Sequence, residues 1–155
     1  MIKSLIRILF PKTNQVSTNN PNVNVQRGCW GENVAASYLI RIGWRVIERN
    51  VRPCRKDQRC EIDIIAYVPE EKRVVFVEVK THYRYSSYAG RLWAINRRKK
   101  SNLLRACACW LIERKWHGNF RFDVIEVYGK NEKGVNPEID HITNVKLFPP
   151  YWRFW

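Results

Sequence analysis

The sequence predicts a single α/β domain in the order helix, three strands, helix, strand. Apolar residues recur at helical spacing in two long segments, and short runs rich in Val and Ile lie between and after them. The chain has 155 residues, which is the length of one ordinary domain. It is 45% hydrophobic and 27% charged, the balance of a folded globular protein.

The first 25 residues are expected to form an extension outside the domain. Their apolar residues fall on one face of a short amphipathic helix: Ile2, Leu5, Ile6 and Leu9. Residues 11–24 are rich in Asn, Thr and Pro and are typical of a linker. This pattern fits a frayed extension, and it also fits docking on a membrane surface.

The domain is expected to span residues 26–130 and to open with a helix. Five apolar residues recur there at helical spacing, and Gly43 is expected to end the helix. They are Trp30, Val34, Ala35, Leu39 and Ile42. A short strand over 44–49 and a basic loop over 50–59 follow.

A hairpin comes next, because two β-branched runs at 61–68 and 73–80 are separated by four turn-forming residues. A second helix is predicted over about 95–116, ended by Gly118, and a core strand over 120–127. The region 131–155 is predicted to hold an edge strand near 141–147. Its aromatic end is expected to fold back onto the domain or to be buried by a partner.

The charge balance points to a polyanionic partner. Lys and Arg number 28 against 14 acids, a net charge of +14, which fits nucleic acid or an acidic membrane surface. No apolar run approaches the roughly 20 residues that cross a bilayer, so an integral membrane protein is excluded. Five of the acids lie within residues 61–78, between two basic blocks. This acidic centre is where chemistry is expected.

The five cysteines do not predict a disulfide framework, since their number is odd and the chain is long enough to build a core without one. Their spacing also disfavours structural zinc, because it contains no CxxC. Reduced thiols and a cytoplasmic location are expected. Arg7 interrupts the only N-terminal apolar stretch, which argues against a secretory signal.

The hairpin turn fixes a register that brings acids together. If Val68 and Arg73 close the turn, paired positions sum to 141, and Asp63 lies opposite Glu78. The same register sets Glu61 opposite Lys80, with all four side chains on one face. Two opposed carboxylates repel. A hard cation such as Mg²⁺ would relieve the repulsion, and pairing of each acid with one of the many arginines is the alternative.

Asp63 followed by Glu78-Val79-Lys80 resembles the PD-(D/E)XK signature of the restriction-endonuclease-like nucleases. A wider set of residues is similar to the uncharacterised bacterial YraN-type family within that superfamily, over residues 27–128. The set comprises Gly31-Glu32, Gly43-Trp44, Arg49-Asn50, Glu61-Ile62-Asp63, Phe76 to Lys80, Gly90, Lys99, Ala106 and Arg121 to Val124. The chain departs from the family pattern at Cys60, where Gly is usual, and at His82, where Arg is frequent.

The resemblance implies a restriction-endonuclease-like αβββαβ core, a mixed sheet flanked by helices. Asp63 and Glu78 would bind Mg²⁺ or Mn²⁺, and Lys80 would be the catalytic lysine of an endonuclease that hydrolyses phosphodiester bonds. Glu32 would project from the first helix toward the same site. Its other interpretation is a solvated acid in the first turn of that helix.

Nucleic acid, with DNA first, is the expected partner, and a homodimer is left open. The basic residues expected to bind it are Arg55, Arg84, Arg98, Lys99 and Lys100. Lys99 would contact a phosphate or would be one more residue of a charged helix face. Trp93 and the tyrosines of 83–88 suit base stacking or ordinary packing. Two functions stand beside the nuclease: a non-catalytic nucleic-acid-binding module on the same fold, and a membrane-peripheral basic protein.

Overall fold

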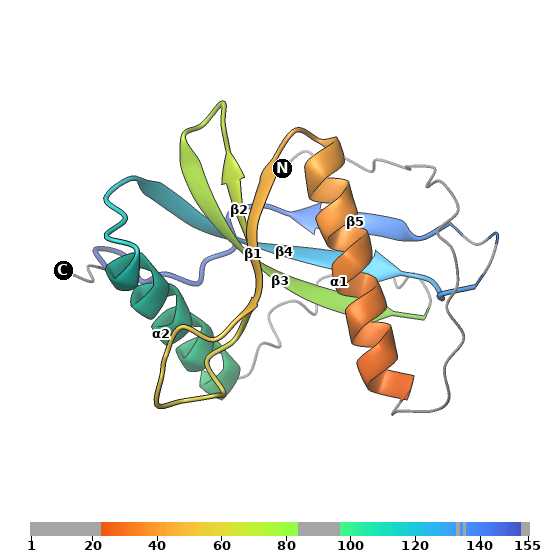
Figure 1. The fold of residues 1–155 in the computed structure, drawn as a ribbon, viewed down its shortest axis with the longest axis horizontal. Coiled ribbons are helices and arrows are strands. Elements are labelled where there is room, and N and C mark those ends of the chain that lie inside the picture. Colours follow the sequence, from red (N-terminus) through yellow and green to blue (C-terminus); the bar gives the residue numbers. More distant parts are fainter. Residues whose placement is uncertain (1–22, 84–96, 133, 135, 153–155) are drawn as a thin grey trace.

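A computed structural model describes residues 23–83, 97–132, 134 and 136–152 (Figure 1). The predicted N-terminal amphipathic helix lies outside these residues, and so does most of the Tyr- and Trp-containing loop. The elements in chain order are α1 (Val23–Arg41), β1 (Arg45–Val51), β2 (Ile62–Val68), β3 (Arg73–His82), α2 (Arg97–Glu113), β4 (Asn119–Tyr128) and β5 (Glu138–Ile142). Neither helix is long and apolar enough to cross a membrane.

The described strands form one mixed sheet in the order β1-β2-β3-β4-β5. β3 and β4 are parallel, and every other neighbouring pair is antiparallel. Parallel neighbours need a long crossover connection, and here α2 lies within it. The predicted α/β class is therefore confirmed, and β5 corresponds to the edge strand expected after the core order.

The two helices cover opposite faces of the sheet (Figure 1). Alternate residues of β3 show this, because side chains of a strand point to the two faces in turn. Val74 and Phe76 pack with the apolar side of α2, whereas Val75 and Val77 pack with α1. Each helix thus buries its apolar side in a separate core.

The ends of the helices differ in how well the sequence predicts them. Gly43 ends α1 with φ +89°, and the amide of Trp44 bonds back to the carbonyl of Leu39, as expected. Gly118 was predicted to end α2, and this is wrong. The helix stops at Glu113, and Lys115 adopts the left-handed conformation with φ 50°. Glycine usually occupies the left-handed position that ends a helix, but here a lysine occupies it, so the local sequence does not predict where α2 ends.

The strands follow the predicted pattern except at the last edge. The four-residue turn between β2 and β3 is confirmed by the pairing of Val68 with Arg73. The edge strand predicted near 141–147 lies instead at Glu138–Ile142, paired with β4. Beyond it, Phe148 and Trp152 pack against the core on the α2 side, so this part of the aromatic end folds back onto the domain.

Candidate functional site

The site begins where the hairpin ladder ends. Paired positions sum to 141 throughout, and the last backbone pair of the ladder is Ile64 with Val77. One residue further, Asp63 bonds the other strand through its side chain: Oδ2 accepts a hydrogen bond of 2.7 Å from the amide of Val79. The register of the hairpin was predicted correctly. At this end, however, the side-chain carboxylate of Asp63, and not a backbone carbonyl, accepts the hydrogen bond from β3. Asp63 is thereby fixed beside the segment that carries Glu78.

Glu78 is the most deeply buried acid of the predicted set, at 1% exposure. Its Oε1 accepts hydrogen bonds from the Nζ of Lys80 at 2.7 Å and forms an ion pair with the Nζ of Lys99 at 2.8 Å. Its Oε2 is also buried and has no hydrogen-bond partner among the described residues. A buried carboxylate oxygen without a partner is costly and requires an explanation such as a bound water or ion.

The two carboxylates interact electrostatically. Burial and, second, the negative charge of Glu78 raise the pKa of Asp63 to about 7. The amide of Val79 and the charge of Lys99 act in the opposite direction but do not cancel the rise. No ion pair joins Asp63 to a basic side chain among the described residues, so arginine pairing does not account for it. The expected repulsion is present in the structure.

Lys99 is held inside this cluster. Burial alone would lower its pKa, but the nearby carboxylates, Glu78 foremost, outweigh burial and raise the pKa above its ordinary value. The ammonium group therefore stays charged. Lys99 stands at the start of α2, so the helix brings a cation from outside the hairpin to the acidic centre. It is more than one residue of a charged helix face.

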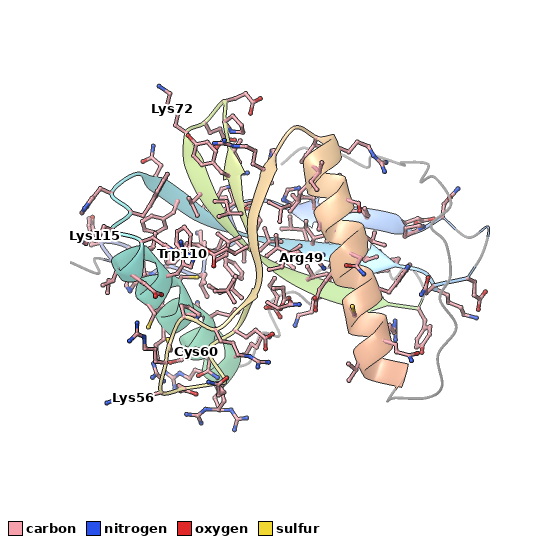
Figure 2. The ribbon with its side chains drawn as sticks, viewed as in Figure 1. Arg49, Lys56, Cys60, Lys72, Trp110 and Lys115 are labelled. Atoms are coloured by element: carbon pink, nitrogen blue, oxygen red, sulfur yellow. The ribbon has the colours of Figure 1, made fainter. Side chains whose placement is uncertain are left out.

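Glu32 lies close to the same centre. Its charge is among the causes that raise the pKa of Asp63. The side chain of Arg49 on β1 reaches toward α1 (Figure 2), with Nη2 at 4.0 Å from the carboxylate of Glu32 and at 2.8 Å from Oδ1 of Asn33. Because α1 begins at Val23, Glu32 is in mid-helix. The interpretation as a first-turn acid is therefore wrong.

The turn arithmetic predicted Glu61 opposite Lys80, but the backbone pairing of β2 with β3 does not extend to Glu61. It precedes β2 and accepts hydrogen bonds from Arg52 of the neighbouring loop, the shorter at 2.9 Å. The backbone ladder has already ended at this point, so alternation no longer places the side chain. Glu61 thereby pairs with Arg52, and after Glu78 and Asp63 its charge also contributes to the raised pKa of Lys99.

Sequence reasoning missed a second buried acid beside Lys80. Glu126 of β4 is the register partner of Lys80 and is 5% exposed. The hydroxyl of Tyr128 donates to its Oε2, and Nε2 of His82 lies 3.5 Å from its Oε1. An acid inside an apolar strand was a usable signal. Its position next to Lys80 depends on the parallel register of β3 and β4, which no turn determines.

The remaining predicted nucleic-acid contacts lie on the surface, apart from the acidic centre. Arg98 and Lys100 are exposed on the first turn of α2, and Arg55 is exposed in the loop over residues 52–61. This 52–61 loop is joined to α2 by an ion pair of 3.0 Å between Asp57 and Arg105. These basic residues therefore belong to two neighbouring segments. Arg84 lies outside the described residues.

The donor set suits a small oxygen-seeking cation. The described residues contain no group of three or more His, Cys, Asp or Glu side chains able to hold a metal ion. Mg²⁺ is commonly bound by one or two carboxylates, with water and phosphate oxygens completing its octahedron. Asp63 and Glu78, with the unpartnered Oε2, fit that pattern. Two lysines beside them could contact an anionic substrate.

Comparison with known proteins gives a family without an assigned activity. The model of the uncharacterised protein family UPF0102 matches residues 31–127. A UPF0102 protein from Pelobacter propionicus is 39% identical over 129 residues, 83% of this chain and 86% of the relative. One from Mycobacterium tuberculosis is 37% identical over 133 residues, 84% and 99%. One from Clostridium botulinum is 41% identical over 106 residues, 67% and 80%. The matched segment contains every residue of the acidic centre.

Proposed function

The chain belongs to the uncharacterised protein family UPF0102, and from this premise we propose that it is a metal-dependent nuclease of the PD-(D/E)XK type. One observation carries the proposal. A buried carboxylate, Glu78, keeps one oxygen without a partner while the neighbouring Asp63 has a pKa raised to about 7. The αβββαβ order is consistent with a restriction-endonuclease-like core.

Asp63 and Glu78 would hold the metal ion. A bound Mg²⁺ or Mn²⁺ would supply polarisation of a phosphoryl oxygen and a lowered pKa of bound water. Binding there would give Glu78 Oε2 a partner and would neutralise the repulsion between the two acids. Glu32 adds negative charge at slightly longer range and favours a cation at the same place.

The lysines would act on the substrate. Lys80 and Lys99 share Oε1 of Glu78 and stand on different elements, so they flank the carboxylate. Lys80 would stabilise the negative charge that develops on the phosphate under attack. Lys99 would contact a phosphate from α2. The exposed basic residues nearby, Arg55, Arg98 and Lys100, would bind the phosphates of a nucleic acid, with DNA as the first candidate.

The test is cleavage of a panel of single-stranded, duplex and branched nucleic acids with Mg²⁺ and with Mn²⁺. Lys80→Ala should lower the rate by roughly 10²–10³-fold, the usual effect of removing one group that stabilises transition-state charge. Affinity should change little, because one charge among 28 basic residues contributes little to the field. Lys72→Ala, an equal loss of charge in the hairpin turn, is the control that should cleave normally.

A second candidate is a nucleic-acid-binding module without chemistry. It is favoured by the pairing of Glu78 with two lysines, which neutralises the acid without any metal. The same panel separates the two functions. Salt-dependent binding with no cleavage of any substrate in either metal would support the module and contradict the nuclease.

A further inference from the structure

Two segments about fifty residues apart bring cysteine thiols together. Cys54 lies in the 52–61 loop and Cys109 on α2, and their sulfur atoms are 2.7 Å apart. Cys60, also of the loop, lies close enough to contribute, after burial and Cys109, to the raised pKa of the Cys54 thiol. Cys107 lies close enough for Cys54 to contribute to its raised pKa. All are free thiols in this structure.

Contacts other than the one between the two sulfur atoms hold this arrangement. Asp57, three residues after Cys54, accepts hydrogen bonds from Arg59 and forms the ion pair with Arg105 of α2. Hydrogen bonds from Arg59, foremost, hold the pKa of Asp57 below its usual range, so it stays charged at physiological pH. The thiol of Cys54 also points to the carbonyl of Arg105, at 3.6 Å. The two cysteines are thus positioned before any bond forms.

The spacing fits a covalent bond better than a metal. Two thiolates on one tetrahedral zinc ion lie about 3.8 Å apart, given Zn–S bonds of about 2.3 Å. The observed 2.7 Å is well below that value, and the described residues hold no group of three or more metal-binding side chains. We propose that Cys54 and Cys109 are a modification site that forms a reversible disulfide when the protein meets a hydroperoxide.

The reaction has a defined order. Cys109 is half-buried, whereas Cys54 is only 7% exposed, so the peroxide reaches Cys109 first. Burial, and then the hydrogen bond with Cys109, raise the pKa of Cys54, which keeps its proton until the second step. Cys60 and Cys107 are fully buried and out of reach of the oxidant. Cys29 is exposed but lies on α1, on the other side of the sheet.

Both steps balance. Cys109 releases its proton, and the thiolate attacks one peroxide oxygen. The S–O bond forms, the O–O bond breaks, and sulfur gives two electrons; the leaving hydroxide or alkoxide takes up the proton that Cys109 released, which yields a sulfenic acid and water or an alcohol. The sulfur of Cys54 then attacks the sulfur of Cys109. The S–S bond forms, the S–O bond breaks, and hydroxide leaves as water with the proton from Cys54. A dithiol reductant reverses the product.

The disulfide would fasten the 52–61 loop to α2. The 52–61 loop carries Arg55, and α2 carries Arg98, Lys99 and Lys100. The disulfide proposal does not depend on the nuclease function. Its consequence is a covalent link across a long chain segment, which restricts the unfolded chain. The oxidised protein should therefore melt about 5–15 °C higher than the reduced protein.

The experiment treats the full chain with hydrogen peroxide and counts thiols by alkylation and mass spectrometry. The five thiols should fall to three with a loss of two hydrogens, and dithiothreitol should restore both the count and the lower melting temperature. Cys107 and Cys109 share one tryptic peptide, so fragmentation must locate the bond at Cys109. Cys29→Ser should behave as wild type, and Cys54→Ser should leave Cys109 as a sulfenic acid that dimedone traps.

Two results would overturn the proposal. One is a bond that fragmentation assigns to another pair, including one between two chains. The other is five intact thiols, or single-cysteine oxidation without a bond, in wild-type protein that is still folded. Both are read from the wild type, so a variant that fails to fold does not affect the outcome.

Discussion

Asp63 and Glu78 show how far single residues could be predicted. Acids are scarce in this chain, and the four-residue turn fixes the register, so both were found from the sequence together with their mutual repulsion. Lys99 came from a resemblance, and its contact with Glu78 depends on where α2 crosses the sheet. Glu126 was missed because a parallel neighbour reached through a helix has no turn to set its register. Reasoning from the local sequence therefore identified the residues that the hairpin contributes to the candidate site, but not those that α2 and β4 bring to it.

The charge on Asp63 should cost stability in the metal-free protein. Asp63→Asn keeps an oxygen that accepts the hydrogen bond from Val79 but removes the repulsion with Glu78. We expect the variant to be more stable than wild type at pH 8 by at least about 0.5–1 kcal/mol, the size of other opposed like charges on a sheet, because burial of the charge adds to the repulsion. Thermal melts without metal measure this. Lower stability of the variant at pH 8 would instead favour a structural salt-bridge role.

The same variant should reveal the pH window. The pKa of Asp63 is raised to about 7 in the folded protein, so between about pH 4 and pH 7 the folded state binds a proton that the unfolded chain has released. Wild type therefore loses stability as pH rises through that window. The variant has no such group, so its advantage should be absent near pH 4 and complete above pH 7. Melts across this range, compared pairwise, test the sign.

Mn²⁺ should stabilise the wild type at pH 8 and should stabilise Asp63→Asn much less. Ligand-linked stability requires the binding site, and the variant lacks one of its two carboxylates. The difference appears in melts with increasing Mn²⁺. Equal metal-induced shifts in the two proteins would contradict the metal site at Asp63 and Glu78, whatever substrate the protein cleaves.

At the scale of elements, α1 and β3 approach so closely that only glycine fits at one position. A Cβ on Gly31 would lie 2.0 Å from Oγ1 of Thr81, and the Cβ and Cγ2 of that threonine are also near. Rotation of Thr81 therefore does not relieve the clash. This contact sets the distance between α1 and β3. Gly31 directly precedes Glu32, so the same contact fixes how far Glu32 lies from β3.

Gly31→Ala should therefore destabilise the protein by about 1–3 kcal/mol, the usual cost of overpacking. Gly28→Ala is a matched control on the same helix, because a Cβ there meets nothing within 4 Å. It should stabilise by about 0.5–1 kcal/mol through helix propensity. Denaturant unfolding measures both. Equal effects of the two substitutions would show that α1 moves freely relative to β3.

Elements with a local boundary signal were predicted, and those without one were not. The turn between β2 and β3 and the end of α1 at Gly43 follow from their own residues. The end of α2 is set by Lys115 in a left-handed conformation, which lysine rarely adopts. The edge strand is set by pairing with β4, so its bounds depended on a partner that the local sequence does not reveal.

At the scale of the whole molecule, the net charge of +14 is distributed unevenly. Five acids fall within the segment 61–78, while the 52–61 loop and the start of α2 carry exposed basic residues. Lys72 lies at the tip of the hairpin, at the end of the view opposite Lys56 of the loop (Figure 2). Lys72 and Lys56 carry the same charge but lie far apart on the molecule. Total charge determines long-range attraction, but only phosphate contacts release counterions.

Binding to duplex DNA should therefore weaken steeply with salt, and the steepness should depend on position. Each neutralised phosphate contributes about −0.9 to the slope of log affinity against log salt, so about 4–8 contacts give a slope of about −4 to −7. Lys100→Ala, on the first turn of α2, should reduce the steepness by about one unit. Lys72→Ala removes the same charge at the hairpin tip and should leave the slope unchanged. Fluorescence anisotropy titrations at four salt concentrations measure all three proteins. An affinity indifferent to salt would contradict nucleic acid as the partner, and equal slopes for the two variants would contradict the α2 surface as the place where it binds.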